Sequence, residues 1–186
     1  DPPGPCITAD EGIREHPDAE KMAGLKTVFA ENGRTTAANA SQLSDGAAAL
    51  LVADRGYAEQ QGLKPRARFR AMSVAAADPV IQFTAILEAT RKALKIAGLS
   101  VADIDLFEVN EAFAGVPLMF QREFDIPDDK LNVNGGACAL GHPIGASGSR
   151  IIVTLIHALQ QHGGKKGIAS LCIGGGEATA MAIELI

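Results

Sequence analysis

Two spacings of apolar residues alternate along the chain from about residue 64 to its end. Apolar positions three and four residues apart predict helices over residues 79–97, 112–124 and 147–161. Short apolar runs predict buried strands over residues 67–75, 104–109, 131–134, 167–173 and 178–186. The order β-α-β-α-β-α-β-β predicts an α/β fold with a mixed, mostly parallel sheet and helices on both faces. The closing hairpin is expected to add an antiparallel edge.

The first 63 residues follow a less regular pattern. Helical spacing predicts a helix over residues 19–30 and a second, shorter one over residues 55–61. Residues 34–54 are interpreted as two short strands joined by a polar loop. Because two strands alone are not stable in water, they are expected to need a sheet that this sequence does not obviously contain.

Composition narrows the class of protein. Hydrophobic residues make up 47% of the 186 residues, enough for a sizeable core, and aromatic residues only 4%. The net charge of −5 argues against a nucleic-acid partner. No apolar run reaches the length of a membrane span. Three cysteines and no visible signal peptide predict a reducing, cytoplasmic location. The start at Asp-Pro-Pro-Gly-Pro rather than Met predicts a fragment or a processed product.

A glycine-rich stretch at residues 132–150, NVNGGACALGHPIGASGSR, holds one histidine, His142. Its glycines allow tight turns, and Pro143 restricts the backbone next to the imidazole. The stretch leads into an apolar helix. A histidine on a rigid turn beside a helix N-terminus suits acid–base chemistry on an anionic or carbonyl substrate. The loop by itself is equally compatible with a glycine turn that carries an incidental histidine.

Three candidate sites fall at or just after the carboxyl ends of predicted strands: Asn110-Glu111, His142 and Cys172. Ligands of open α/β sheets bind at that edge. Each site has a structural alternative. Asn110 could cap a helix and Glu111 could be a first-turn acid. Cys172 could be a small buried apolar residue, and residues 174–176 could be only a turn. Their joint placement on one edge favours a functional site.

Four segments together carry a resemblance to a known family. They are VNEAFA at 109–114, NVNGGACALGHPIGASGSR at 132–150, LCIGGGEATAMAIE at 171–184 and, more weakly, TAANASQLSDGAAA at 36–49. In these segments the chain resembles the thiolases, the acyl-CoA:acetyl-CoA C-acyltransferases. A thiolase subunit has two similar βαβαβαββ domains and a loop domain. The resemblance implies a loop-domain tail over residues 1–33, the last strands and helix of the N-terminal domain over 34–63, and the C-terminal domain over 64–186.

The resemblance implies catalytic roles for four residues. His142 matches the histidine that activates the nucleophilic cysteine and donates to an oxyanion hole. Asn110 matches the asparagine that holds a water in that hole. Cys172 matches the second reactive cysteine, an acid/base, and Gly174 matches a glycine whose N–H contributes to a second oxyanion hole.

Four further matches concern coenzyme A, which the family uses as part of its substrates, with no permanently bound cofactor and no metal. Ser41 matches a serine that touches the pantetheine, and Arg14 an arginine near the adenine-nucleotide end. Ala112 and Phe113 match residues that line the pantetheine tunnel. The resemblance also implies a homodimer or tetramer for the complete subunit.

The sequence departs from the family in two places. The acyl-carrying cysteine belongs to the first half of the subunit, which this chain lacks. Cys6 lies outside the family's nucleophile motif, and Cys138 matches no known role. Residues 78–90, DPVIQFTAILEAT, replace a Gly/Pro-rich loop that shapes the acyl pocket in many thiolases, so the preferred acyl length is open.

Two hypotheses follow. The chain is the C-terminal part of a thiolase that works with the missing half, or it is a non-catalytic thiolase-like module. A ketoacyl-synthase-type condensing enzyme is less well matched, because Asn110-Glu111 and the GHPIG motif favour thiolase. A nucleotide-binding protein ranks last, because no GxGxxG follows the first strand.

Overall fold

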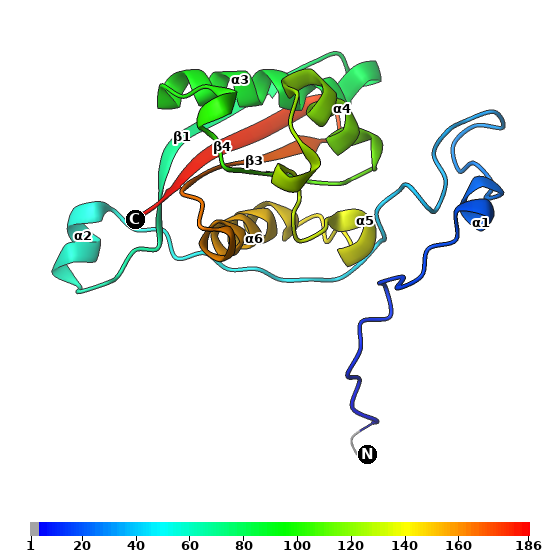
Figure 1. Cartoon of the computed structure of the whole chain (residues 1–186), viewed down its shortest axis with the longest axis horizontal. Coiled ribbons are helices and arrows are strands. Elements are labelled where there is room, and N and C mark those ends of the chain that lie inside the picture. Colours follow the sequence, from blue (N-terminus) through cyan, green and yellow to red (C-terminus); the bar gives the residue numbers. More distant parts are fainter. Residues whose placement is uncertain (1–3) are drawn as a thin grey trace.

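The computed structural model describes residues 4–186. Four strands form one sheet in the order β1-β4-β3-β2. Their bounds are β1 (Ala67–Ala76), β2 (Leu106–Val109), β3 (Lys166–Ile173) and β4 (Glu177–Leu185). β1, β2 and β3 run in one direction and β4 runs opposite to them, which confirms a mixed sheet. Two of its three strand pairings are antiparallel, because β4 lies between β1 and β3 (Figure 1). The predicted antiparallel edge is wrong, because β4 pairs with β3 on one side and β1 on the other.

Helices cover both faces of the sheet, as predicted (Figure 1). α3 (Ala85–Ala97) and α4 (Gly115–Phe124) lie on one face, and α6 (Ser147–His162) lies on the other. The alternation of side chains along β4 divides the core accordingly. Ala178, Ala180 and Ala182 pack toward α3, whereas Met181 and Ile183 pack toward α6. Small residues under α3 let this helix approach the sheet closely.

The predicted helix over residues 79–97 has two parts. It starts as a short 3-10 segment, η1 (Pro79–Thr84), which is itself kinked at Ile81 and leads directly into the regular helix α3. Gly98 ends α3 in the left-handed conformation that glycine adopts without strain.

The predicted helix over residues 112–124 starts later, at Gly115. Residues 112–114 pair instead with a distant segment: Ser41 N–H donates to Ala112 O at 3.1 Å, and Ala114 N–H donates to Asn39 O at 2.8 Å. The short connections η2 (Val101–Asp103), η3 (Asp128–Lys130) and α5 (Ala137–Leu140) complete this part of the fold.

The predicted strand over residues 131–134 is wrong. Leu131 makes a single parallel bridge to Phe107, at the free edge of β2. Asn132 then adopts a positive φ of 48°. Its side-chain amide accepts from Val109 N–H at 2.7 Å and donates to Val109 O at 2.9 Å. The side chain thus takes the place of the backbone partner that a longer strand would have supplied.

The first 54 residues contain little regular structure where they are described. The predicted helix over 19–30 is shorter, α1 (Ala19–Ala23), and it is followed by an isolated bridge between Thr27 and Thr36. The two strands predicted over 34–54 are wrong. The described residues there form isolated bridges only, because no strand of the sheet lies beside them to complete a ladder. α2 (Arg55–Gln60) forms as predicted, and the segment before α1 extends away from the sheet (Figure 1).

Among residues 4–186, no helix combines the length and the apolar character needed to cross a membrane.

Candidate functional site

Asn110 and Cys172 lie at the carboxyl edge of the two parallel strands. Asn110 follows β2, and its N–H donates to Ser170 O of β3 at 3.0 Å. Cys172 lies two residues beyond Ser170, just before the turn at Gly174 that leads into β4. Asn110 does not cap a helix, since α4 begins five residues later without a side-chain cap. The sheet therefore brings these candidates to the edge at which α/β proteins bind ligands.

A loop far along the chain places His142 beside Asn110. Gly141 has a φ of 91°, and a side chain at this position would overlap Ser44. The N–H of His142 donates to Gln42 O at 3.1 Å. The imidazole Nε2 lies 3.4 Å from Asn110 Nδ2, and Nδ1 lies 2.6 Å from Ser147 Oγ. Burial, and then the nearby Arg150 charge, lower the pKa of His142, which favours a neutral imidazole.

The amide of Asn110 is fully buried and half satisfied. Its Nδ2 faces His142, whereas its Oδ1 has no hydrogen-bond partner within the described part of the chain. Buried amide oxygens in proteins are almost always hydrogen-bonded. This oxygen is therefore a point at which a donor from a ligand or a water is expected to bind.

Glu111 anchors the glycine-rich loop to the end of β2. Its carboxylate accepts from Asn132 Nδ2 at 2.9 Å and from Cys138 N–H at 3.1 Å. Gly136 lies so close that a side chain there would overlap this carboxylate. The alternative that Glu111 is a first-turn helix acid is wrong, because the helix starts after it. The sequence signal was available: an acid at a strand end, and a glycine pair that leaves room for it.

A buried ion pair, missed from the sequence, lies next to this loop. Glu108 of β2 is 1% exposed and accepts from Arg150 Nη1 of α6 at 2.8 Å. Burial raises the pKa of Glu108 to about 7, although Arg150 opposes the shift. The only hint in the sequence is a charged residue inside the apolar run of β2.

The side chains of Cys172 and His142 are not hydrogen-bonded to each other in the described part of the chain. Cys172 packs against the core on the α3 side. Burial raises the pKa of the Cys172 thiol, so the thiol carries its proton at neutral pH. Cys138 is half-buried with a pKa raised to about 11 by burial and Glu111, and Cys6 is exposed.

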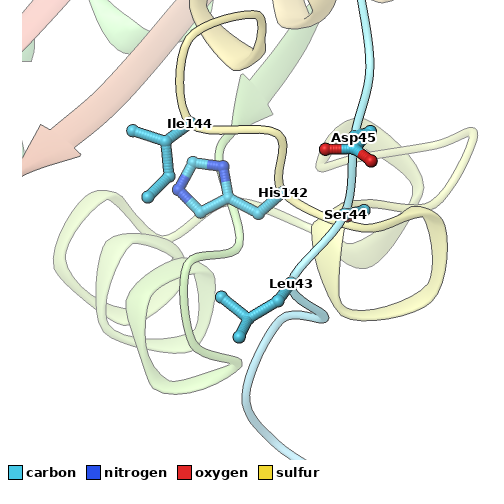
Figure 2. A pocket seen from close by; sticks show the side chains of 5 residues that line it. All are labelled: Leu43, Ser44, Asp45, His142 and Ile144. Atoms are coloured by element: carbon cyan, nitrogen blue, oxygen red, sulfur yellow. The ribbon is translucent and has the colours of Figure 1, made fainter.

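A shallow pocket of about 400 Å³ opens at His142. Figure 2 shows the imidazole with Ile144 from the glycine-rich loop and with Leu43, Ser44 and Asp45 from the segment before α2. Leu43 is 98% exposed and Ile144 is 80% exposed, an unusual position for large apolar side chains. The pocket is therefore open on this side.

A second, mostly apolar pocket of about 450 Å³ adjoins η1 and the start of α4. Phe113 lies in its wall, with ring centroids 5.4 Å from Phe83 and 6.2 Å from Phe29. The lining residues are Phe29, Arg34, Thr35, Asn39, Gln82, Phe83, Phe113 and Gly115. Of the predicted coenzyme A residues, Ser41 is tied to Ala112 by a backbone hydrogen bond next to this wall. Arg14 is exposed, in the segment before α1.

Gly174 starts the turn between β3 and β4 and is exposed. The turn is held from two sides, because Gly175 N–H donates to Gln82 Oε1 at 3.1 Å and Ala77 N–H donates to Gly176 O at 2.8 Å. Gly176 has a φ of 103° and lies against the backbone of Ala77, so no larger residue fits there.

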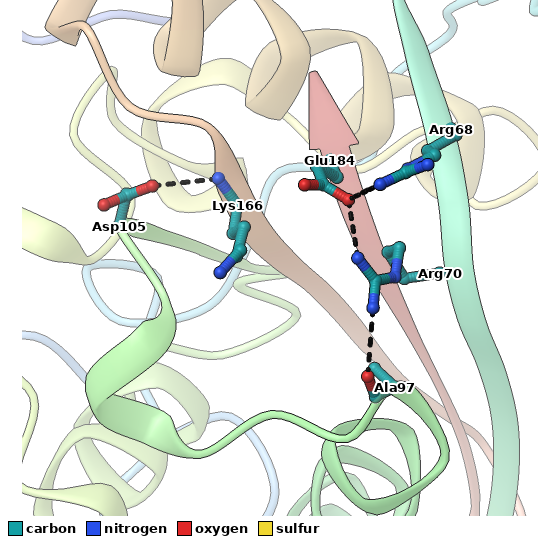
Figure 3. Close-up of polar contacts among 6 residues, drawn as sticks. All are labelled: Arg68, Arg70, Ala97, Asp105, Lys166 and Glu184. Carbon is teal, nitrogen blue, oxygen red and sulfur yellow. Dashed lines mark hydrogen bonds and ion pairs between the residues drawn. The ribbon is translucent and has the colours of Figure 1, made fainter. Parts of the chain in front are cut away.

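At the end of the sheet opposite to Asn110 and Cys172, where β1, β2 and β3 begin, charged residues have a structural role (Figure 3). Arg68 and Arg70 both donate to Glu184 Oε2, and these hydrogen bonds lower the pKa of Glu184 to about 2. Asp105 accepts from the backbone N–H groups of Lys165 and Lys166. These contacts join the starts of β1, β2 and β3 to their neighbours.

Comparison with known proteins gives one family. The family model for the thiolase C-terminal domain matches residues 63–185, and the model for the thiolase N-terminal domain matches residues 3–56. The acetyl-CoA acetyltransferase of Chromobacterium violaceum is 49% identical over 96% of this chain and 46% of its own length. A steroid 3-ketoacyl-CoA thiolase of Mycobacterium tuberculosis is 48% identical over 94% of this chain and 42% of its own length.

Solved structures agree with these relatives. The Bacillus anthracis acetyl-CoA acetyltransferase matches 95% of this chain and 45% of its own, with a TM-score of 0.90 and 47% identity. Human mitochondrial 3-ketoacyl-CoA thiolase in complex with CoA matches 97% of this chain and 46% of its own, with a TM-score of 0.87 and 39% identity. The chain spans about half the length of the relatives that it matches. By sequence and by fold, this chain belongs to the thiolase family.

Proposed function

We propose that this chain supplies the second half of a thiolase active site, which transfers acyl groups between acyl-CoA and acetyl-CoA. The observation that carries the proposal is the pair of His142 and Asn110 at the carboxyl edge of the sheet, with Nε2 and Nδ2 3.4 Å apart. The relatives named acetyl-CoA acetyltransferase and 3-ketoacyl-CoA thiolase support the reaction class.

Acyl transfer on a thioester places negative charge on a carbonyl oxygen. A fixed donor aimed at such an oxygen typically lowers the activation free energy by about 3–4 kcal/mol. We assign these donors to His142 once its Nε2 has accepted a proton from the nucleophilic thiol, to a water held by Asn110, and to the N–H of Gly174. A lowered pKa keeps His142 neutral at pH 7, so that it can accept a proton from a nucleophilic thiol. Cys172, whose thiol is protonated at rest, is the proposed proton donor and acceptor for the second substrate.

Coenzyme A is proposed as part of the substrates rather than as a resident cofactor, and the proposal assigns no role to a metal. Ser41, Ala112 and Phe113 would contact the pantetheine, and Arg14 the nucleotide end. Support comes from the apolar wall around Phe113 and from the relative whose structure is described with CoA.

The missing partner is the first half of a thiolase subunit, which would contribute the acyl-carrying cysteine. Two observations support this. The chain spans about half the length of its relatives, and the cysteine within the glycine-rich loop, Cys138, has a raised thiol pKa. The complete subunit is proposed to act in the cytoplasm as a homodimer or tetramer.

The test is thiolysis of a 3-ketoacyl-CoA by free CoA in the subunit assembled from both halves. His142→Ala is expected to abolish turnover, whereas His16→Ala, which changes an exposed histidine, should leave it intact. Retained turnover in His142→Ala would overturn the role of His142.

The second candidate is a non-catalytic module, favoured by the lack of any cysteine hydrogen-bonded to His142 within residues 4–186. Thiolysis by the subunit assembled from both halves separates the two, because only a catalytic half makes its turnover depend on His142. Turnover by the assembled subunit that is lost in His142→Ala would exclude the non-catalytic module.

A further inference from the structure

A chain of hydrogen-bonding groups runs from Asn110 through His142 into the first turn of α6. Asn110 Nδ2 lies 3.4 Å from His142 Nε2, and His142 Nδ1 lies 2.6 Å from Ser147 Oγ. Ser147 Oγ in turn lies 3.1 Å from Pro143 O. Ser147 and Asn110 are fully buried, so the groups in this chain depend on one another for their hydrogen bonds.

With the Asn110 amide oriented so that Nδ2 faces His142, the donors and acceptors in this chain allow one arrangement of protons. A neutral imidazole carries a proton on one ring nitrogen and an acceptor lone pair on the other. Asn110 Nδ2 is a donor without a lone pair to offer, so Nε2 of His142 must be the acceptor. Nδ1 then carries the proton and donates to Ser147 Oγ. The hydroxyl of Ser147 donates to Pro143 O, an acceptor that also closes the first turn of α6.

We propose that Ser147 is a positioning residue that holds His142 in the tautomer protonated at Nδ1. Nε2 is then the unprotonated nitrogen, and it faces Asn110 and the side on which the reacting groups would lie. The proposal concerns Ser147, which neither the family resemblance nor the comparisons assign. It rests on the proposed function only for its catalytic consequence, because the tautomer itself is a property of the resting protein.

Position along the chain explains why Ser147 can act in this way. It is the first residue of α6, five residues after His142, and Pro143 restricts the backbone between them. The first turn of a helix is anchored by the whole helix, which packs on the sheet through Ile151, Ile152 and Leu155. The packed helix therefore fixes the position of the Ser147 hydroxyl. The hydroxyl can in turn fix both the orientation of the His142 ring and the nitrogen that carries its proton.

The direct test is ¹⁵N NMR of the imidazole rings in ¹⁵N-histidine-labelled protein, which contains only four histidines. In the native chain, His142 is expected to show a protonated Nδ1 and an unprotonated Nε2. Ser147→Ala should move proton population to Nε2, and Ser147→Thr, which restores a hydroxyl, should return it to Nδ1. Ser149→Ala is the matched control, since Ser149 lies in the same helical turn. A native His142 protonated at Nε2, or a ring unchanged by Ser147→Ala, would overturn the proposal.

Thiolysis by the assembled subunit provides the second measurement. Ser147→Ala is expected to lower kcat by roughly tenfold with little change in KM, because a smaller share of His142 has Nε2 free as a base. An unchanged kcat in Ser147→Ala would also count against the proposal. If the subunit proves inactive, the proposed function fails while the NMR result still decides the role of Ser147.

Discussion

Replacing Glu108 by glutamine should change how the stability of this protein depends on pH between about 4.5 and 7. Glu108 is 1% exposed, and burial raises its pKa from 4.5 to about 7 despite the partner Arg150 at 2.8 Å. Within this window the folded protein holds a proton on Glu108 that the unfolded chain has lost. Stability from this group is therefore complete below the unfolded pKa and decreases as the pH rises through the folded pKa.

The magnitude follows from the shift. One pKa unit corresponds to about 1.4 kcal/mol, so a shift from 4.5 to about 7 gives a loss on the order of 3 kcal/mol across the window. For a domain of this size, that is about 6–12 °C in Tm. Glu108→Gln retains the shape of the side chain and removes the titration. As the pH rises, the variant should thus become more stable relative to the native protein, as measured by the difference in their unfolding free energies.

Urea unfolding at half-unit steps from pH 4.5 to 7.5 measures this difference, in which the other titrating groups cancel. Glu59→Gln, which changes an exposed acid of α2, should give a flat difference curve. The linkage reasoning would be refuted by a difference curve for Glu108→Gln that is flat, or by one in which the variant loses stability relative to the native protein as the pH rises.

Two further predictions concern glycines. Gly136→Ala should push the Glu111 carboxylate away from Cys138 N–H, destabilise the loop by about 1–3 kcal/mol and lower the turnover of the assembled subunit. Gly145→Ala, which has open space around it, should have neither effect. Equal losses of stability and turnover in the two variants, measured by urea unfolding and thiolysis, would contradict this. Leu155→Ala should cost about 2–5 kcal/mol, because this side chain is 1% exposed. Gly167→Ala in that background should recover part of the loss, since Leu155 Cδ1 lies 2.7 Å from where the new methyl would be; strictly additive unfolding energies would argue otherwise.

The sequence was sufficient for elements whose signal is local. The apolar periods located the strands β1, β3 and β4 and the helices α3 and α6 to within a few residues, apart from the 3-10 turn before α3. The glycine-rich loop around His142 was also evident, because glycine and proline restrict or free the backbone wherever they occur. Periodicity of this kind depends only on neighbours three or four residues away.

What the sequence could not decide are the contacts between distant segments. Whether β4 lies at the edge or inside the sheet depends on β1, about a hundred residues earlier. The pattern at residues 131–134 suits a strand, yet the side chain of Asn132 takes over the pairing with Val109.

The candidate site divides in the same way. The motifs singled out Asn110, His142 and Cys172, but the hydrogen bonds that hold His142 between Asn110 and Ser147 appear only in three dimensions. The same holds for the Glu108–Arg150 pair, because a charge inside an apolar run does not reveal its partner. Residue types along the chain determine which chemistry is available, and long-range packing decides which groups meet, since burial and hydrogen-bond geometry are properties of the folded whole.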